Sequence, residues 1–283
     1  MAKRPLVDFL VRCFQFSVRR ACRLVKLARG TFLLQLKPRS LEHIRVPLLE
    51  LARARPRFGY RRLMVLMWNR GIRVGKNTVY KVYKQEKLGL RHRKFKKRRM
   101  HLRVVPPPAL RPNDRWAIDF ITDETVCGRK FRILNVIDVA TRKLLGEVVD
   151  RRLPATRVIE CLDVCAKKAG MYPTTITCDN GPEFISIVMD EWAAQRNVGL
   201  DFITPGTPTE NGYIESFHAR QREECLEMHS FRTLEEARLI IADWRRDYNS
   251  LRPHSSLGDK TPNQVWKELS EQLNNRSFKE AAV

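Results

Sequence analysis

An aspartate inside an apolar strand pattern is the feature that most constrains how this chain can fold. Asp119 lies in the run 116–121, whose other residues are tryptophan, alanine, isoleucine and phenylalanine. A buried carboxylate is costly unless a cation or hydrogen-bond donors compensate its charge. Asp179 directly follows the strand-like segment 175–178, and Glu215 lies in the segment 211–218. If these three acids meet, the fold must also supply something that offsets their repulsion.

Positive charge is concentrated in the first third of the chain. The 283 residues carry a formal net charge of +23. Residues 1–105 contain 30 lysines and arginines against 4 acids, whereas residues 106–283 contain 24 against 27. An excess confined to one region indicates a polyanionic partner rather than an ordinary solvated surface. Nucleic acid is favoured over a membrane, because no apolar stretch approaches the roughly 20 residues that span a bilayer.

The seven cysteines are scattered and odd in number, with no secretory signal ahead of them. This usage is typical of reduced cytosolic thiols. Cys161 and Cys165 are four residues apart in a helical pattern with no histidine nearby, so they are interpreted as two small core residues and not as zinc ligands.

Short helices are predicted throughout the basic region. Residues 15–37 contain two of them, at 17–25 and from Gly30 onward. A further helix has Pro47 in its first turn and ends near Ala54, another opens within 57–63, and a third runs from Asn77 to about residue 89. Such helices with basic exposed faces are typical of a reader of the DNA major groove, and the alternative is a basic bundle without sequence preference. The candidate DNA contacts here are Arg61, Arg62, Lys76, Lys81 and Lys84.

A basic linker follows. Residues 91–103 contain eight lysines and arginines, and Pro106, Pro107, Pro108 and Pro112 come after them. This composition predicts a stiff, extended spacer before the next domain.

From Asn113 the pattern changes to that of an α/β domain. Five strands are predicted, at 115–122, 130–136, 143–149, 174–178 and 200–203. Helices are predicted at 155–170, 184–196, from Thr207 to about Met228, and at 234–249. Three antiparallel strands followed by strands that alternate with helices indicate a mixed sheet covered by helices.

The predicted strands and helix can bring Asp119, Asp179 and Glu215 close together. Asp119 falls near the middle of the first strand and Asp179 just past the end of the fourth, so the two approach one edge if these strands are neighbours. Thr207 and Glu210 form a predicted capping box that starts the next helix, with Glu215 two turns in. Asn211, Glu215, His218 and Arg222 then share one stripe, while the adjacent face, which includes Gln221, packs inward.

Carboxylates in this arrangement favour a divalent metal. Mg²⁺ prefers oxygen ligands and retains waters that substrate phosphates can replace. Two such ions can activate the attacking oxygen and stabilise the leaving oxygen of a phosphoryl transfer. Asp138 and Glu183 are rival acids, and spacing alone leaves the choice between them and the three acids open.

Longer motifs carry a family resemblance. Residues 179–184, Asp-Asn-Gly-Pro-Glu-Phe, and residues 210–217, Glu-Asn-Gly-Tyr-Ile-Glu-Ser-Phe, resemble the integrase core. The chain is similar, more narrowly, to the second-frame (OrfB) products of bacterial insertion-sequence transposases of the two-reading-frame type. Four further stretches fit that family, at 57–62, 136–143, 220–226 and 248–258.

The resemblance implies a ribonuclease-H-like core that performs metal-dependent DNA cleavage and 3′-hydroxyl strand transfer at insertion-sequence ends. It assigns the metal-binding and catalytic roles to Asp119, Asp179 and Glu215, with Mg²⁺ as the cofactor and Mn²⁺ able to substitute. Arg222 is the implied basic residue near the DNA end, and Asn211 and His218 are further candidate contacts. No zinc module of the retroviral kind is expected.

The same resemblance implies double-stranded DNA as the partner, a homo-oligomer on that DNA, and a first-frame (OrfA) partner or fusion. It implies a cytoplasmic bacterial protein, associated with the nucleoid when DNA-bound and with no membrane partner. The expected fold is a five-stranded mixed sheet flanked by helices, preceded by a small all-helical, helix-turn-helix-type DNA-binding region. The expected domains are a helix-turn-helix-like segment at 1–40, a basic helical domain at 41–91, a linker at 92–112, the catalytic core at 113–268 and a tail at 269–283.

Two other functions fit parts of the sequence. A non-catalytic DNA-binding regulator would explain the basic region but not the three acids. A structure-selective nuclease with the same core would explain the acids but would give cut products without joined ones. The loop with Arg252, His254 and Ser255 either contacts phosphate or pins helices together, and Trp116 and Trp244 are expected in the core.

Overall fold

The computed structural model describes residues 3–34, 40–90, 109–204 and 208–280. The chain forms two compact units, Met1–Arg45 and Val46–Val283. Within the described residues, no helix combines the length and apolar character needed to cross a membrane. The predicted basic linker at 91–103 and its prolines up to Pro108 lie outside the described residues.

The first unit contains three helices, α1 (Lys3–Phe14), α2 (Val18–Leu24) and α3 (Arg29–Leu33). Its small core is made by Val7, Ala21 and Cys22. Ser17 caps α2, because its side chain accepts a hydrogen bond from the backbone of Arg20. The two helices predicted within 15–37 are therefore confirmed, whereas α1 was not predicted.

Helix α4 (Glu42–Ala54) runs across the boundary at Arg45, and α5 (Tyr60–Asn69) and α6 (Lys76–Gln85) follow it in the second unit. The expectation that Pro47 marks a first turn is wrong, because α4 starts at Glu42 and Pro47 lies inside it. A proline there leaves the carbonyl of His43 without its helical donor. His43 is exposed, so that carbonyl can bond to water and the helix tolerates the break.

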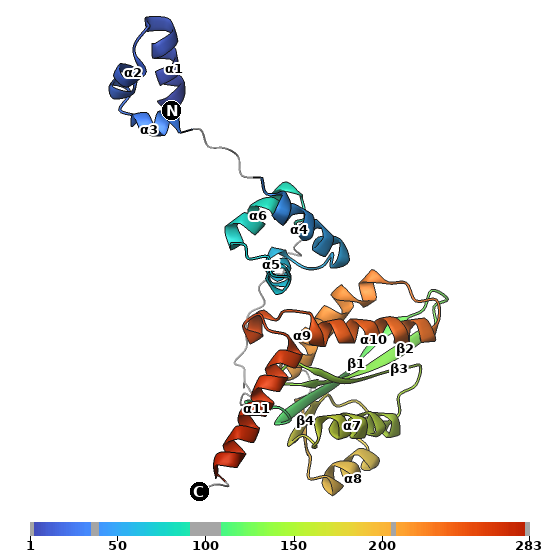
Figure 1. The fold of residues 1–283 in the computed structure, drawn as a ribbon. Coiled ribbons are helices and arrows are strands. Elements are labelled where there is room, and N and C mark those ends of the chain that lie inside the picture. The colour runs from blue at the N-terminus through green and yellow to red at the C-terminus, as the bar shows by residue number, and fades with distance from the viewer. Residues whose placement is uncertain (1–2, 35–39, 91–108, 205–207, 281–283) are drawn as a thin grey trace. The chain divides into compact units, whose positions relative to one another are not determined.

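A five-stranded mixed sheet forms the centre of the second unit (Figure 1). Its strands are β1 (Arg115–Glu124), β2 (Lys130–Asp138), β3 (Leu144–Asp150), β4 (Thr175–Cys178) and β5 (Gly199–Phe202), in the order β3-β2-β1-β4-β5. The first three strands pair antiparallel, while β4 lies parallel to both β1 and β5. The mixed α/β fold class is thereby confirmed.

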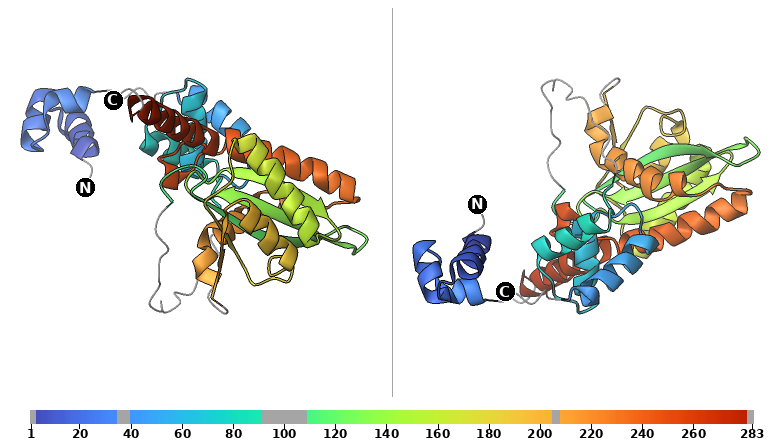
Figure 2. Two further views of the ribbon diagram at one scale, coloured as in Figure 1. Left: turned by 90° about the horizontal axis from the view of Figure 1, so that it is seen from below. Right: turned by 90° about the horizontal axis from the view of Figure 1, so that it is seen from above.

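Helices cover both faces of the sheet (Figures 1 and 2). Helices α7 (Ala155–Ala169) and α8 (Ile187–Gln195) lie on one face, and α9 (Gly212–Glu224) and α10 (Leu234–Ser250) lie on the other. Short 3-10 turns precede and follow α9, at Pro208–Asn211 and Leu226–Met228, and a third forms Ser255–Leu257. A last helix, α11 (Pro262–Glu280), was not predicted.

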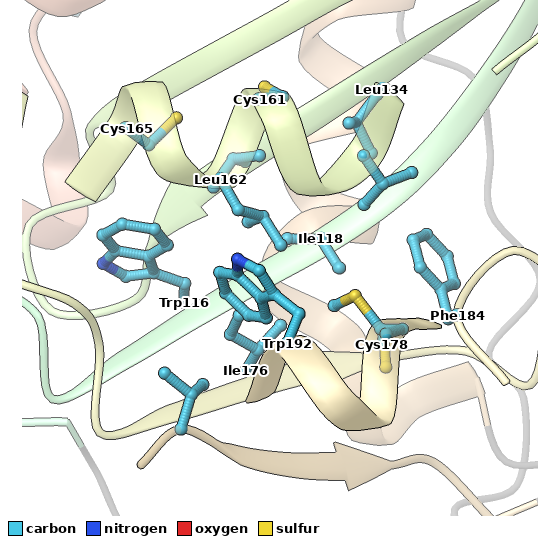
Figure 3. Close-up of a cluster of buried hydrophobic side chains, with 14 of the residues drawn as sticks. Trp116, Ile118, Leu134, Cys161, Leu162, Cys165, Ile176, Cys178, Phe184 and Trp192 are labelled. Atoms are coloured by element: carbon cyan, nitrogen blue, oxygen red, sulfur yellow. The ribbon is translucent and has the colours of Figure 1, made fainter. Parts of the chain in front are cut away.

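The largest core cluster fills the space between the sheet and helices α7 and α8 (Figure 3). Trp116 is fully buried there, as expected, and its indole N–H donates to Asn113 Oδ1 at 3.0 Å. Cys161 and Cys165 are buried in the same cluster, which confirms their interpretation as core residues. Gly146 of β3 faces them, and a methyl group in its place would overlap Cys165 Sγ.

Strand alternation decides which face each residue of β1 takes. Trp116 and Ile118 belong to the cluster under α7 and α8, whereas Ala117 and Ile121 pack toward α9 and α10. Asp119 has the same parity as Ala117 and Ile121. It therefore lies on the face of the sheet that α9 covers.

Candidate active site

The pairing of β1 with β4 brings two of the predicted acids to one edge of the sheet. The parallel register matches Trp116 with Ile176 and Ala117 with Thr177. Continued by two residues, the same register sets Asp119 beside Asp179. The turn after β4 is stabilised by Asp179 itself, because Gly181 N donates to its Oδ1 at 3.0 Å. The first and fourth predicted strands, β1 and β4, are thus neighbours, which the sequence analysis had only assumed.

Glu215 reaches the site from α9, but from a different position in its helix than predicted. Residues Pro208–Asn211 form a 3-10 turn, and α9 begins only at Gly212. Glu215 therefore lies in the first turn of α9 and not two turns into it. Glu210 lies in that 3-10 turn, ahead of α9, and its carboxylate accepts a hydrogen bond from Thr204 N at 2.7 Å. The other half of the predicted capping box, Thr207, lies outside the described residues.

The three acids share one electrostatic environment. Burial, with smaller contributions from the negative charges of Asp179 and Glu215, raises the pKa of Asp119 to about 6. The hydrogen bond from Phe120 N to Asp119 Oδ1, at 2.7 Å, opposes this effect. Burial also raises the pKa of Glu215. Among the described residues, however, no group of three His, Cys, Asp or Glu side chains is arranged so that it could enclose a metal ion.

The donor set nevertheless fits a hard divalent cation. All three side chains offer carboxylate oxygens, which Mg²⁺ and Mn²⁺ accept as ligands. A cation would also relieve the repulsion that Asp119 experiences from Asp179 and Glu215.

His218 lies beside Asp119 and is shielded from solvent. Its Nδ1 is 3.5 Å from Asp119 Oδ2, and its side chain is 12% exposed. Burial, with a smaller contribution from the nearby charge of Arg222, lowers the pKa of His218 to about 4, so the ring is neutral near pH 7. Its Nε2 lies 3.1 Å from Asn135 Nδ2.

Sequence analysis placed Gln221 on the inward face of its helix but gave no polar role in this region to Gln221 or to Asn135. Both are fully buried, and they hydrogen-bond to each other. Asn135 interrupts the apolar strand run 133–137, and Gln221 interrupts the apolar face of its helix. These interruptions were the available signals, because polar residues at core positions need a partner.

The rival acids have structural roles in this fold. Asp138 is buried and accepts hydrogen bonds from Asn113 N at 2.9 Å and from Thr141 Oγ1 at 2.6 Å. Glu183 pairs closely with Arg132, whose guanidinium also lies over the ring of Phe120.

The predicted DNA contacts fall into exposed and enclosed groups. The exposed side chains are Arg61, Lys76, Lys81, Lys84 and Arg222. The enclosed side chains are Asn211, which is 4% exposed and donates to Ile118 O at 3.4 Å, His218, and Arg62. Arg62 pairs with Glu224 at 3.0 Å. The enclosed residues therefore offer little surface to a DNA chain.

Of the two interpretations of the loop after α10, the contacts of Arg252 and His254 fit the one in which the loop pins helices together. Arg252 is 4% exposed and donates through Nε and Nη2 to the two carboxylate oxygens of Glu224, at 2.7 Å each. His254 is also buried, next to Arg252. The loop thus pins the end of α9 to the end of α10. Trp244 is partly buried against the cores under α9 and α10, as expected.

Comparison with known proteins finds relatives for nearly the whole chain. An integrase core domain model matches residues 109–208, and a second integrase core domain model matches residues 196–262. The uncharacterized 31.7 kDa protein of insertion element IS407 from Burkholderia multivorans is 41% identical over 249 residues, which are 88% of this chain and 90% of that protein. The 39.2 kDa protein of insertion element IS476 from Xanthomonas euvesicatoria is 38% identical over 93% of this chain and 76% of its own length.

A solved structure supports the fold alone. A chain of the simian T-cell lymphotropic virus intasome, in complex with a PP2A regulatory subunit, matches with a TM-score of 0.50 at 15% identity. The match covers 77% of this chain and 74% of the other.

Proposed function

This chain belongs to the insertion-sequence transposases of the DDE integrase superfamily, and we propose that it cleaves DNA at insertion-sequence ends and joins the new 3′ end to target DNA. Its general activity is therefore DNA transposition by a polynucleotidyl transferase. The observation that carries the specific proposal is the register of β1 on β4, which sets Asp119 beside Asp179 in the field of Glu215.

Asp119, Asp179 and Glu215 would hold the divalent metal, Mg²⁺ or Mn²⁺. When bound, two such ions supply Lewis-acid activation of the attacking oxygen and stabilisation of the leaving oxygen. The chain's own contribution is a rigid edge: Asp119 lies within β1, and Asp179 is held by Gly181 N at 3.0 Å. Closure of the three carboxylates around the ions would accompany metal binding.

Two balanced steps follow from this chemistry. In cleavage, a water oxygen forms a bond to phosphorus, the bond from phosphorus to the 3′ oxygen breaks, and that oxygen leaves as a 3′-hydroxyl after taking a proton. In joining, the 3′ oxygen loses its proton and bonds to a target phosphorus, and the target strand's own 3′ oxygen leaves. Neither step requires a serine, tyrosine or cysteine nucleophile.

Double-stranded DNA is the proposed partner of the basic amino-terminal third. Lys76, Lys81 and Lys84 are exposed along α6, and Arg61 is exposed on α5. Arg222, exposed on α9, donates to Thr122 O at 3.3 Å and lies on the same helix as Glu215. A homo-oligomer, with a first-frame partner or fusion, completes the proposal, because joining two DNA ends requires more than one active site.

Replacement of Asp119 tests the proposal. Labelled insertion-sequence ends are incubated with the full chain and Mn²⁺, and cut and joined products are separated by size. Asp119→Asn should reduce both products by at least about a thousandfold, because a metal ligand is removed, while the affinity for DNA changes little. Asp123→Asn, on the same strand, is the matched control and should retain activity.

Two outcomes would contradict this assignment. Activity retained by Asp119→Asn would remove Asp119 from the metal site. Cut products without joined ones in the wild-type protein would instead identify a nuclease.

A further inference from the structure

A line of polar side chains runs from Asp119 into the core, on the face of the sheet that α9 covers. Asn135 is the cross-strand partner of Asp119 on β2 and is fully buried. Gln221 of α9 is fully buried as well. Amide groups at such positions are costly unless their hydrogen bonds are made. The hydrogen bonds that these two amides make are therefore important for the stability of this region.

The two amides hold each other in one orientation. Asn135 Nδ2 donates to Gln221 Oε1 at 2.8 Å, and Gln221 Nε2 donates to Asn135 Oδ1 at 3.3 Å. Turning only one amide over would place donor against donor and acceptor against acceptor. The reciprocal pair thus allows two states, the one described and the one with both amides turned over, and the residue that faces Asn135 Nδ2 decides between them.

That residue is His218, and both edges of its ring fit the same tautomer. Asp119 Oδ2, which as a carboxylate oxygen only accepts, lies 3.5 Å from His218 Nδ1 and therefore places the ring hydrogen on Nδ1. Nε2 is then an acceptor, and Asn135 Nδ2, at 3.1 Å, is the donor that faces it, which selects the described orientation of the two amides. The opposite tautomer would set an N–H against the Asn135 amide and a lone pair against the carboxylate.

We propose that Asn135 and Gln221 are positioning residues that hold His218 as its Nδ1–H tautomer, so that this N–H orients the Asp119 carboxylate for metal binding. Phe120 N already donates to Asp119 Oδ1 at 2.7 Å. A donor facing Oδ2 would therefore fix the plane of the carboxylate from both oxygens. The separation of 3.5 Å is long for a hydrogen bond, and contacts of this kind commonly shorten when a site is filled.

Only the last step, orientation for metal, rests on the proposed function. The tautomer of His218 follows from the hydrogen-bonding groups alone. Two measurements therefore separate the two parts of the inference.

The first measurement reads the tautomer in the metal-free full chain. Long-range ¹H–¹⁵N spectra of histidine-labelled protein should show His218 protonated at Nδ1 and unprotonated at Nε2, with its signals identified by their absence from His218→Phe. The double variant Asn135→Leu/Gln221→Met replaces both amides with apolar side chains of similar size, which preserves packing. Its His218 should become a mixture of tautomers. An Nε2–H ring in the wild-type protein would overturn the proposal, whether or not the chain is a transposase.

The second measurement is a calorimetric titration with Mn²⁺. Loss of a group that orients a metal ligand typically weakens metal binding 10–100-fold, so the double variant and His218→Phe should each bind at least about 10-fold more weakly. His218→Asn, whose amide nitrogen takes the place of Nδ1, should retain most of the affinity. A purely structural role would show no such rescue.

Equal Mn²⁺ affinities in wild type and variants would overturn the positioning role while leaving the tautomer result intact. Absence of Mn²⁺ binding in every protein, wild type included, would overturn the proposed function and the positioning role with it. Thermal unfolding of each variant establishes that the compared proteins are folded.

Discussion

At the scale of single residues, Glu147 is deeply buried, and the negative charge of its carboxylate is only partly compensated. It lies on β3 opposite Asn135, with its side chain 7% exposed. Its nearest cation is Arg245, at 3.8 Å from Oε1, and among the described residues Oε2 has no hydrogen-bond partner. Burial raises the pKa of Glu147 to about 7, and the charge of Arg245 only partly opposes this.

Stability should consequently fall as Glu147 ionises. The carboxyl titrates near 4.5 in an unfolded chain and near 7 in the fold, so between these values the folded state binds more protons and rising pH favours unfolding. The contribution is about 3 kcal/mol, at roughly 1.4 kcal/mol for each tenfold change in proton affinity. Urea unfolding of wild type and Glu147→Gln from about pH 4 to about pH 8 measures it. The wild type should lose stability relative to the variant, and a pH-independent difference would contradict the prediction.

At the scale of secondary-structure elements, one buried ion cluster joins three segments. Glu224 at the end of α9 accepts from Arg252, which follows α10, and from Arg62 of α5 at 3.0 Å. The side chains of Glu224 and Arg252 are each 5% exposed. Removing one partner of such a bidentate pair strongly destabilises the fold, because the other partner is left as an uncompensated buried charge.

Glu224→Gln should therefore lower the free energy of unfolding by about 3 kcal/mol or more. The adjacent Glu223 supplies a matched control, since its pair with Arg220 is 44–46% exposed and worth well under about 1 kcal/mol. Denaturant melts of Glu224→Gln and Glu223→Gln provide the comparison. If both variants lose the same small amount, the cluster does not hold the three segments together.

At the scale of the whole molecule, the dominant property is the uneven distribution of charge. The net charge of +23 arises within the first 105 residues, because the remainder carries slightly more acids than bases. The integrase core domain, in a region of nearly balanced charge, has little electrostatic attraction of its own for DNA. Affinity would then come from the basic region and from the counterions that its phosphate contacts release.

DNA affinity should therefore fall steeply with salt, and the slope should depend on α6. Replacing Lys81 and Lys84, both exposed on α6, by glutamine should reduce the slope of log affinity against log salt by about 1 for each phosphate that a lysine no longer neutralises. The same change at Lys167 and Lys168, exposed on α7, is the matched control and should leave the slope unchanged. Fluorescence anisotropy across a salt series measures both, and a flat response in the wild type would exclude the basic region as the docking surface.

Most elements of the integrase core region could be predicted from the sequence because their causes are local. Alternation of apolar residues predicted β1 to β3 within two residues of their observed ends, and helical spacing predicted α7 and α10. The start of α9 could not be predicted in this way. The 3-10 turn at Pro208–Asn211 and the bond from Thr204 N to Glu210 depend on the chain that enters from β5, and together they moved Glu215 into the first turn.

The sequence by itself determined the class of fold and the division of charge, and it supplied the candidate acids, since these depend on residue type and short-range spacing. Only the tertiary structure decided that Asp119 continues the register toward Asp179 and that Asn135 meets Gln221, 86 residues away. Strand order and helix placement set such contacts, and they are satisfied only when the whole core closes. The tautomer of His218 belongs to this second group, because both edges of its ring face residues that distant parts of the chain supply.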